Sequence, residues 1–353
     1  MLMKTEVLKP DKEALVKASN ILKQGGLVAF PTETVYGLGA NALDKDAVLE
    51  IFKAKNRPAD NPLIVHIWSR DQLPSICEIP PGATSLMDAF WPGPLTLLFP
   101  KKGSIPSVVT AGLDTVAVRM PSHPVAQQLL KECSLPVAAP SANTSGRPSP
   151  TEASHVLEDM NGRIPLILDG GNCDVGVEST VLDICHGLPC ILRPGGITRE
   201  MLESALNGPV SLAASILRPL QPGEKALSPG MRYRHYAPRG TVTLVEGSEQ
   251  NVVAALKKLY LADTSAGKKS CVMCFTEHLD ILRDCRPRDL GSCHDPAQTA
   301  HRLFNTLRSL DDDGMETVYS ESVSLEGIGL AVMNRLGRAA SFRILEANRL
   351  IST

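Results

Sequence analysis

Apolar residues recur at helical intervals along several stretches of the chain. Between residues 11 and 24 they fall on one helical face, and Gly25-Gly26 follows as the expected helix C-terminus. Asp44 is a suitable N-cap for a second helix over 44–53. The same spacing predicts three more helices before residue 207, over 124–133, 151–160 and 198–206.

Short apolar runs between these helices predict β-strands, because they are bounded by glycine, proline and small polar residues. The runs cover 27–30, 63–67, 95–99, 115–120, 137–139, 164–168, 178–184 and 189–192. Several of these strands follow one another with no helix between them. We therefore expect an α/β fold whose sheet is mixed rather than purely parallel.

A proline-rich stretch over 208–239 interrupts this pattern. After it, strands over 241–245, 269–275 and 316–320 alternate with helices over 248–261, 295–310 and 329–340, which predicts a small Rossmann-like α/β unit. Its first strand is not followed by the G-x-G-x-x-G fingerprint of dinucleotide-binding folds. A chain of 353 residues also exceeds what one core usually supports. We expect domains over 1–207 and 240–353, joined by a linker over 208–239.

Charge argues against a general affinity for nucleic acid or membranes, since the formal net charge is −2. Residues 1–207 hold 18 Lys and Arg against 22 Asp and Glu, and only the linker is basic, with 5 against 1. The N-terminus has no signal-peptide pattern, and no run of 18 apolar residues occurs. These features predict a cytoplasmic protein that does not span a membrane.

The nine cysteines lie at irregular spacings, which indicates free thiols in a reducing compartment. Cys271 and Cys274, with Cys285 and Cys293-His294 further on, have a spacing that zinc sites use. However, the strand predicted over 269–275 sends residues 271 and 274 to opposite faces. We therefore expect core cysteines and no metal site.

A cluster of cations stands out after the second predicted helix. Lys53, Lys55 and Arg57 alternate with small or polar residues and end at Pro58, which disfavours helical backbone at Arg57. At such a helix-to-loop junction, two cations can clamp a polyphosphate. The alternative is an ordinary solvated helix end.

Further polar residues emerge where apolar strands end. Ser141-Ala-Asn143 follows the strand that ends at Pro140, and open α/β sheets bind ligands at that edge. The alternative there is a turn-rich loop. Arg119 and His66 also lie near strand ends, although a lone strand histidine is usually structural. No Ser-His-Asp or Cys-His order in the chain is compelling, and no H-E-x-x-H motif or Walker loop is present. Positioning and charge stabilisation around phosphate would suffice for chemistry.

The linker carries the segment Met231-Arg-Tyr-Arg-His-Tyr-Ala237. A solvated spacer rarely combines two tyrosines, a histidine and two arginines so densely. We expect this segment to be a lid over the N-terminal domain and not a passive tether. The alternative is a rigid spacer that packs between the domains.

Taken in order, these segments resemble the YrdC-like family of threonylcarbamoyl-AMP synthases, in its longer two-domain form. The resemblance covers nearly the whole chain. It runs through P-T-E-T-V-Y-G-L-G (31–39), K-x-R (55–57), N-P-L-I-V-H (61–66), W-P-G-P-L-T (91–96), A-V-R-M-P (117–121), A-A-P-S-A-N (138–143), G-V-E-S-T-V (176–181), L-R-P-G (192–195), S-P-G-M-R-Y-R-H-Y-A-P (228–238) and G-L-A-V-M-N-R-L-x-R-A-A (329–340).

The resemblance implies a reaction in which L-threonine, bicarbonate and ATP give threonylcarbamoyl-adenylate and pyrophosphate. This is the first step toward threonylcarbamoyladenosine in tRNA, and Mg²⁺ would accompany ATP. It implies an N-terminal mixed sheet with a concave basic cavity, and transferase proteins that pass the product to tRNA. The oligomeric state, those partners and the role of the second domain stay open.

The resemblance also assigns residues by their position in the motifs. The implied threonine site is Thr34, His66, Arg119, the backbone of Ala139, and Ser179, with Arg119 holding the carboxylate. The implied ATP contacts are Arg57, Asn61, Thr115, Ser141, Ser149, Arg193 and Tyr236. Lys55 and Asn143 complete the paired motifs and would face the phosphates, with Lys55 and Arg57 as the catalytic cations.

Two rival functions are worth separating from this one. A double-stranded RNA or tRNA-binding module without catalysis would use a basic cavity, but the acidic balance of residues 1–207 argues against a broad phosphate-tracking surface. A related domain handles carbamoyl-adenylate in hydrogenase maturation, yet the acylphosphatase-like and zinc-finger segments around that domain are missing here.

Overall fold

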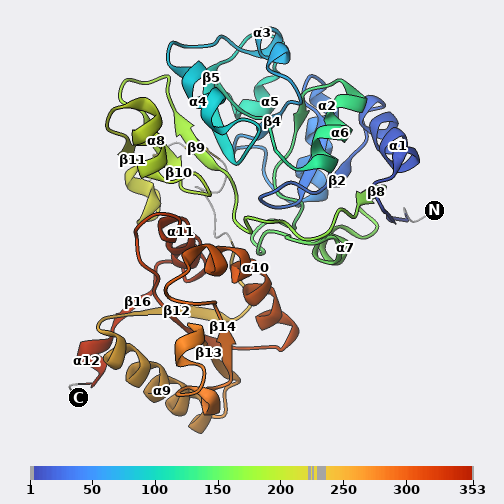
Figure 1. Cartoon of the computed structure of the whole chain (residues 1–353). Helices are drawn as coiled ribbons and strands as arrows, with labels where there is room; N and C mark the ends of the chain where they lie inside the picture. The colour runs from blue at the N-terminus through green and yellow to red at the C-terminus, as the bar shows by residue number, and fades with distance from the viewer. Residues whose placement is uncertain (1–3, 222–223, 225, 229–235, 352–353) are drawn as a thin grey trace. The chain divides into compact units, whose positions relative to one another are not determined.

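The computed structural model describes residues 4–221, 224, 226–228 and 236–351. It divides into two compact units (Figure 1). The first comprises Met1–Ser145 and Ser149–Arg232, and the second comprises Gly146–Pro148 and Tyr233–Thr353. The first unit therefore includes residues 208–228, which the sequence assigns to the linker. Most of the expected lid segment, residues 229–235, lies outside the described residues.

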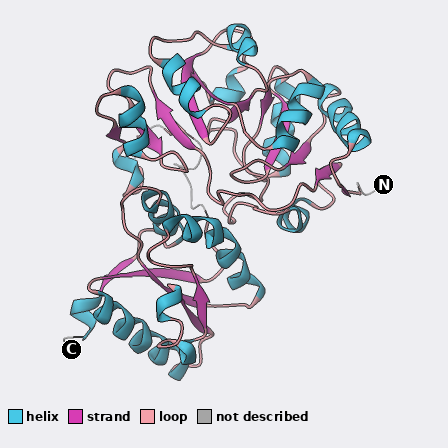
Figure 2. Cartoon of the chain, in the orientation of Figure 1, coloured by secondary structure: helices cyan, strands magenta, loops and turns pink. Residues whose placement is uncertain are grey.

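A mixed sheet of 11 strands forms the frame of the first unit (Figure 2). Its strand order is β1-β8-β2-β3-β7-β4-β6-β5-β9-β10-β11, with parallel and antiparallel pairs interspersed. This confirms the mixed sheet that the sequence predicts. The strands are β1 (Glu6–Leu8), β2 (Val28–Phe30), β3 (Gly37–Asn41), β4 (Ile64–His66), β5 (Leu95–Pro100), β6 (Thr115–Arg119), β7 (Val137–Ala138), β8 (Leu166–Leu168), β9 (Thr180–Asp183), β10 (Cys190–Arg193) and β11 (Ser211–Leu212).

The helices of the first unit begin and end close to the predicted residues. They are α1 (Lys12–Lys23), α2 (Lys45–Ala54), α3 (Leu73–Ile76), α4 (Ala83–Phe90), α5 (Ser107–Thr110), α6 (Pro124–Cys133), α7 (Ala153–Met160) and α8 (Arg199–Leu206), with two short 3₁₀ turns, η1 (Arg70–Gln72) and η2 (Ala214–Ile216). The sequence misses α3, α4 and α5, which are short or lie in a proline-rich region.

Local chemistry sets the ends of the first two helices. Asp11 caps α1 by accepting a hydrogen bond from the Ala14 amide at 2.8 Å, and Asp44 caps α2 through the amides of Asp46 and Ala47. Gly25 follows α1 with a φ of 80°, a left-handed conformation that glycine adopts without steric cost. The apolar face of α1 packs with α6 against the sheet, in a core that includes Leu22, Phe30, Leu129 and Leu166.

The second unit is a parallel five-stranded sheet with helices on both faces. Its order is β14-β13-β15-β12-β16, and in Figure 1 α9 and α12 lie on one face while α10 and α11 lie on the other. The elements are β12 (Thr241–Glu246), α9 (Glu249–Ser265), β13 (Ser270–Cys274), η3 (Thr276–His278), η4 (Arg283–Cys285), β14 (Pro287–Asp289), α10 (Pro296–Asp312), β15 (Thr317–Glu321), α11 (Gly329–Ala339), β16 (Ile344–Glu346) and α12 (Ala347–Ile351). The predicted Rossmann-like unit is confirmed.

None of the helices in the described part of the chain combines the length and apolar character that a membrane crossing needs.

Candidate active site

The two cations at the end of α2 are buried, unlike their neighbour. The helix ends at Ala54, with Lys55 at its C-cap, as the sequence predicts. Lys55 is 3% exposed and Arg57 is 8% exposed. Lys53, by contrast, has a side chain that is 70% exposed and pairs with Glu50 on the helix surface. The alternative interpretation, a solvated helix end, therefore holds for Lys53 but not for Lys55 and Arg57, which are buried.

Lys55 joins the K-x-R motif to the loop after β7. Its Nζ donates hydrogen bonds to the backbone oxygens of Ser141 and Asn143, both at 2.5 Å. The Ser141 hydroxyl in turn donates to Oδ1 of Asn143 at 2.5 Å. A lysine ammonium has three donors, so Lys55 fixes the loop while it places a positive charge beside the two polar side chains. Residues 141–143 thus begin a loop of bends and turns, and Lys55 holds that loop through two of its backbone oxygens.

Arg57 is held by the segment that follows it. Its Nη2 donates to the Asn61 backbone oxygen at 3.1 Å, and its guanidinium lies 5.6 Å from the centre of the Phe52 ring. Asn61 is fully buried, and its side-chain amide, in the orientation that satisfies its neighbours, donates to the Ser228 oxygen at 3.2 Å. Residues near the end of the first unit therefore help to position a predicted ATP contact.

Strand register builds a second polar cluster in the middle of the sheet. His66 on β4 lies opposite Arg119 on β6, and Arg119 lies opposite Thr96 on β5. All three are buried, at 3%, 3% and 0% exposure. Polar side chains in the centre of an apolar sheet are costly unless they are paired, so this row points to a function.

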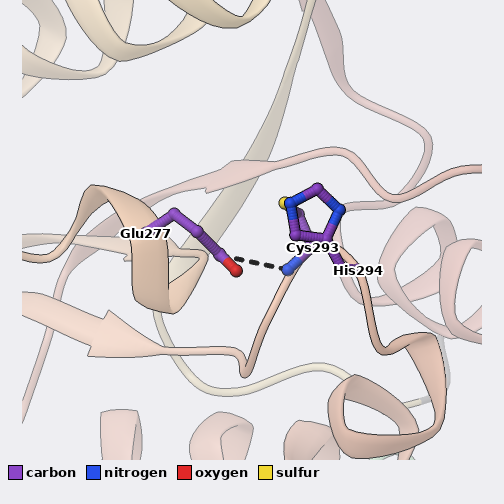
Figure 3. Close-up of side chains that lie close together, drawn as sticks. All are labelled: Glu277, Cys293 and His294. Carbon is purple, nitrogen blue, oxygen red and sulfur yellow. Dashed lines mark hydrogen bonds between the residues drawn. The ribbon is translucent and has the colours of Figure 1, made fainter.

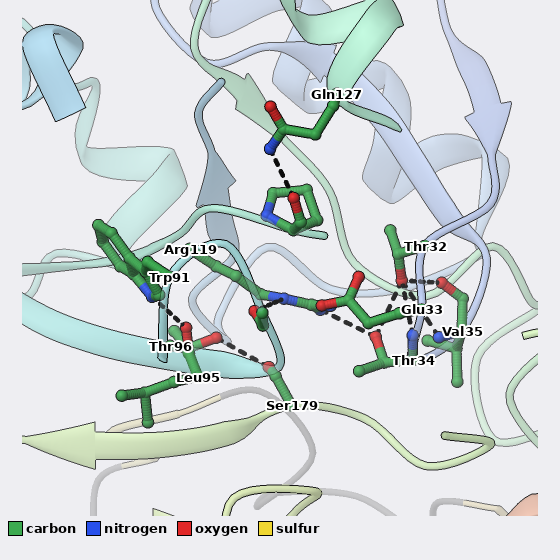
Figure 4. Close-up of polar contacts among 12 residues, drawn as sticks. Thr32, Glu33, Thr34, Val35, Trp91, Leu95, Thr96, Arg119, Gln127 and Ser179 are labelled. Atoms are coloured by element: carbon green, nitrogen blue, oxygen red, sulfur yellow. Dashed lines mark hydrogen bonds and ion pairs between the residues drawn. The ribbon is translucent and has the colours of Figure 1, made fainter. Parts of the chain in front are cut away.

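Arg119 is the centre of this cluster (Figure 4). Its Nη1 donates to the Thr34 hydroxyl at 2.8 Å, and its Nε donates to the Gly93 oxygen at 3.2 Å. Its Nη2 lies 2.7 Å from Oε1 of Glu33 as an ion pair, although the angles fall outside hydrogen-bond geometry. Thr96 and Ser179 share a hydrogen bond of 2.8 Å beside it. We call Glu33, Thr34, Thr96, Arg119 and Ser179 the Arg119 cluster.

The loop between β2 and β3 presents Glu33 and Thr34 to this cluster. The Thr32 hydroxyl donates to the Val35 oxygen at 2.6 Å and accepts from the amides of Thr34 and Val35, each at 3.2 Å. This hydroxyl-closed turn fixes the backbone on both sides of Thr34. It explains why small hydroxyl residues, rather than a helix cap, follow β2.

His66 is neutral in this setting. Burial, followed by the nearby Arg119 charge, lowers its pKa to about 3. The ring packs edge-on against Phe30, and its Nδ1 has no hydrogen-bond partner among the described residues. A neutral imidazole can donate or accept a single hydrogen bond at each nitrogen, so His66 is suited to contact a polar ligand without adding charge.

Ser179 is connected to Arg193, which lies at the end of β10. Arg193 donates to the Ser179 backbone oxygen through Nε and to its hydroxyl through Nη2, both at 3.1 Å. The L-R-P-G motif needs its glycine here, because a Cβ on Gly195 would lie 2.3 Å from the Thr180 nitrogen. Close by in the sequence, Glu178 accepts a hydrogen bond from the buried Ser149 hydroxyl at 2.5 Å.

The two clusters are linked through the start of β3. Gly37 forms an antiparallel bridge with Ser141, and the Ala142 amide donates to the Tyr36 oxygen at 2.8 Å. The loop that carries Thr34 is thus adjacent in sequence to the residues that pair with the Lys55 loop. Both clusters belong to the first unit.

Three predicted site residues lie apart from these contacts. Thr115 begins β6, at the opposite end of that strand from Arg119. The Ala139 amide donates to the Ile64 oxygen at 2.9 Å, so only its carbonyl could meet a ligand. Tyr236 belongs to the second unit, where its ring lies 5.3 Å from Phe304 and 5.7 Å from the Arg335 guanidinium.

Sequence reasoning misses two members of the Arg119 cluster, Glu33 and Thr96, and two residues that support it, Thr32 and Gly93. Glu33 carries the clearest sequence signal, since it is an acidic residue three positions after the end of the buried strand at Phe30. Thr96 interrupts an otherwise apolar strand. Gly93 contributes only a backbone oxygen, for which no sequence signal exists.

The cysteines of the second unit do not form the zinc set that their spacing suggests. Cys271 and Cys274 are buried in β13, where burial raises their pKa to about 11 and about 12. A different group, Glu277, Cys293 and His294, brings its ligand atoms within 4.8 Å of one another (Figure 3). All three are exposed, and Glu277 already accepts hydrogen bonds from Ser292 and the Cys293 amide. Desolvation and the Glu277 charge raise the pKa of Cys293.

Comparison with known proteins covers both units. A family model described as telomere recombination (Sua5, yciO, yrdC) matches residues 20–195, and a model described as threonylcarbamoyl-AMP synthase, C-terminal domain, matches residues 197–341. The threonylcarbamoyl-AMP synthase of Pyrococcus abyssi is 46% identical over 334 residues, which cover 93% of this chain and 94% of the relative. The Bacillus subtilis enzyme of the same name is 43% identical and covers 97% of each chain.

A solved structure gives the same result. The crystal structure of P. abyssi Sua5 complexed with L-threonine has a TM-score of 0.90 and 44% identity, and the match covers 98% of this chain and 99% of that one.

Proposed function

The chain belongs to the Sua5/YrdC family of threonylcarbamoyl-AMP synthases, and from that membership we propose which of its residues perform the reaction. The enzyme is of the nucleotidyltransferase type. The neutral amine of L-threonine attacks the carbon of bicarbonate, which forms a carbamate and releases water, and the carbamate oxygen then attacks the α-phosphorus of ATP. Threonylcarbamoyl-adenylate forms and pyrophosphate leaves. The full-length match to relatives named as synthases favours this enzyme over an RNA-binding module without catalysis.

The Arg119 cluster is the proposed threonine site. The observation that carries this assignment is a buried guanidinium surrounded by hydroxyl groups, with Thr34 at 2.8 Å and Ser179 nearby through Thr96. A guanidinium suits a carboxylate, and hydroxyls suit the hydroxyl of threonine. In this proposal Arg119 binds the substrate carboxylate, while neutral His66, Ser179 and the Ala139 carbonyl line the rest of the amino acid.

The proposed nucleotide site is built around the Lys55 loop. Lys55 and Arg57 supply positive charge where pyrophosphate develops, and this is the main catalytic contribution that phosphoryl transfer asks of a protein. Ser141 and Asn143 lie directly beside Lys55. The remaining proposed ATP contacts in the first unit are Asn61, Thr115, Ser149 and Arg193. Tyr236 belongs to the second unit, and its contact with ATP stays a prediction from the resemblance. Phosphate and ribose offer enough acceptors and donors for all of these groups, and a concave basic face around them stays a prediction.

Magnesium fits this site as a companion of ATP. Mg²⁺ prefers oxygen ligands and takes most of them from phosphates and water. The hydroxyl of Ser141 and the amide oxygen of Asn143 are neutral oxygens of this kind, next to the Lys55 ammonium. When bound, the ion would neutralise charge on the phosphates, and the protein residues would orient them.

The product sets the kind of partner that the enzyme needs. A mixed anhydride of a carbamate and AMP is reactive toward water, so we propose that it passes to a transferase acting on tRNA. Direct tRNA binding would then be weak, in line with the net charge of −2.

Pyrophosphate release from ATP tests the proposed function. Release should require both L-threonine and bicarbonate and should stop when either is omitted. Release that is equal without threonine would reject the assignment. Binding of L-threonine to the protein alone, measured by calorimetry, tests the Arg119 cluster separately from catalysis.

A further inference from the structure

Glu33 is a buried carboxylate whose hydrogen-bonding capacity is not fully used. It is 5% exposed, and neither of its oxygens has a hydrogen-bond partner of good geometry among the described residues. Burial, the largest single influence, raises its pKa, but the Arg119 charge together with polar contacts from Arg119 and from the backbone of Glu33 and Ser122 lowers the pKa overall, so the carboxylate is ionised at neutral pH. Buried carboxylates normally accept several hydrogen bonds. Glu33 therefore presents acceptor sites to whatever enters the Arg119 cluster.

Among the described residues that interact electrostatically with Glu33, Arg119 is the only one that supplies a compensating positive charge. The ion pair measures 2.7 Å between Nη2 and Oε1. The two nearby histidines do not contribute charge, since burial lowers the pKa of both His66 and His123. The cluster is thus one buried cation paired with one buried anion.

A ligand carboxylate bound to Arg119 would compete with Glu33 for the positive charge of the guanidinium. Glu33 would then keep a buried negative charge with no cation assigned to it, which is strongly unfavourable. An amino acid resolves the problem, because its α-ammonium is bonded to the same carbon as its carboxylate. The Arg119–Glu33 ion pair is then replaced by two ion pairs with the zwitterion, one between Arg119 and the carboxylate and one between Glu33 and the ammonium. The ammonium also donates hydrogen bonds to the Glu33 oxygens.

We propose that Glu33 binds the α-ammonium group of L-threonine and so selects amino acids over other carboxylates. The inference rests on the proposed function of the Arg119 cluster as the threonine site. Glu33 lies one residue from Thr34, on the turn closed by Thr32, so carboxylate and hydroxyl enter the site from one rigid loop (Figure 4). Glu33 acts here as a specificity-determining residue that holds the amine.

Calorimetry with two matched ligands tests this role. L-threonine and 2,3-dihydroxybutanoate differ only in that a hydroxyl replaces the ammonium. We expect the wild-type protein to bind threonine at least tenfold more tightly than the hydroxy acid. Glu33→Gln should weaken threonine binding at least tenfold and bring the ratio of the two affinities close to one, while Glu33→Asp keeps a preference for threonine. ATP affinity should be unchanged in both variants.

Asp183→Asn is the matched control. Asp183 is also a buried carboxylate of the first unit, at 7% exposure, but it pairs with His186 and lies outside the cluster. It should leave both affinities unaltered.

The outcomes separate the two proposals. If the wild-type protein binds no threonine, the proposed site fails. If it binds threonine and the hydroxy acid equally well, or if Glu33→Gln keeps the wild-type ratio, the role of Glu33 is overturned. The wild-type comparison decides the matter even if Glu33→Gln does not fold.

Discussion

Lys53, Lys55 and Arg57 show how much one residue's surroundings decide its role. Lys53 points to solvent from α2, whereas the other two cations are buried beside the Ser141–Asn143 loop and Asn61. A buried cation that faces phosphate contributes to catalysis through charge that is already in place.

We expect Lys55→Ala and Arg57→Ala each to abolish most activity while the protein stays folded. Loss of one such contact typically costs about 3–4 kcal/mol, or on the order of a hundredfold or more in rate. Pyrophosphate release measures the effect, and circular dichroism checks the fold. Lys53→Ala is the control and should be near wild type. Near-normal turnover in either buried-site variant would refute the assignment.

The choice of amino acid follows from the hydroxyls and the imidazole around Arg119. A site that hydrogen-bonds the substrate hydroxyl strongly penalises its loss, whereas a missing methyl costs only about 1–3 kcal/mol. We expect threonine to be the best substrate, serine the better surrogate and valine the worse one. Competition in the pyrophosphate assay ranks the three, and equal use of valine and threonine would contradict the proposed contacts.

At the scale of elements, β4 holds an ionisable group that resists protonation. His66 has a pKa of about 3 in the folded protein, against an ordinary 6.5. The unfolded chain therefore takes up a proton as pH falls below 6.5, while the folded protein does not until about pH 3. Because the unfolded state binds more protons in this window, the free energy of unfolding falls on acidification, by up to about 1.4 kcal/mol per pH unit.

We expect thermal midpoints to decline between pH 6.5 and pH 5, and His66→Gln to flatten that decline. Glu33 lowers the free energy of unfolding only at lower pH. Its pKa lies below 4.5 in the folded protein, so its stabilising charge is present above about pH 4.5 and is lost as the pH falls further. Scanning calorimetry across pH measures both slopes. His186→Gln is the control, because His186 has a side chain that is 66% exposed. An unchanged slope in His66→Gln would show that His66 is not the group responsible.

The sequence predicts elements well where one periodicity dominates. Helices α1, α2, α6 and α8 lie within a residue or two of their predicted bounds, because each has an apolar face and most have a clear cap. β3 is missed because Gly37-Leu-Gly-Ala-Asn41 has neither the alternation nor the β-branched residues of a strand. Its pairing with β2 and β7 imposes the extended backbone.

In the candidate site, too, sequence patterns predict some contacts and miss those that depend on tertiary structure. The motifs place Arg119, Thr34 and Ser179 in one site, and the structure brings those residues together. The Glu33 ion pair and the Gly93 carbonyl depend on how loops fold over the sheet. Such contacts arise from tertiary packing, so local sequence patterns carry little information about them.

At the scale of the whole molecule, residues 208–228 should contribute to the thermal stability of the first unit. Residues after 207 pack into that unit: β11 pairs with β10, Val210 and Ile216 are buried, and Ser228 accepts a hydrogen bond from Asn61. Burying one aliphatic side chain contributes about 1.5–3 kcal/mol.

We expect a chain ending at residue 228 to unfold as a cooperative unit and one ending at 207 to melt on the order of 10 °C lower. Differential scanning calorimetry of the two fragments makes the comparison. Equal midpoints would mean that residues 208–228 contribute nothing to the first unit. Hydrogen exchange over 228–238 in the full chain, with and without ATP and threonine, tests the predicted lid independently.

The fluorescence of Trp91 can report on ligand binding at the Arg119 cluster. The chain has only two tryptophans. Trp91 is 6% exposed, and its indole N–H donates to the Leu95 oxygen at 2.7 Å, on the same loop that offers the Gly93 carbonyl to Arg119. Trp68 lies elsewhere, beside Lys131. With Trp68 replaced by phenylalanine, the remaining fluorescence would come from a single chromophore next to the proposed substrate site, so ligand occupancy could be followed by emission in real time without any added label.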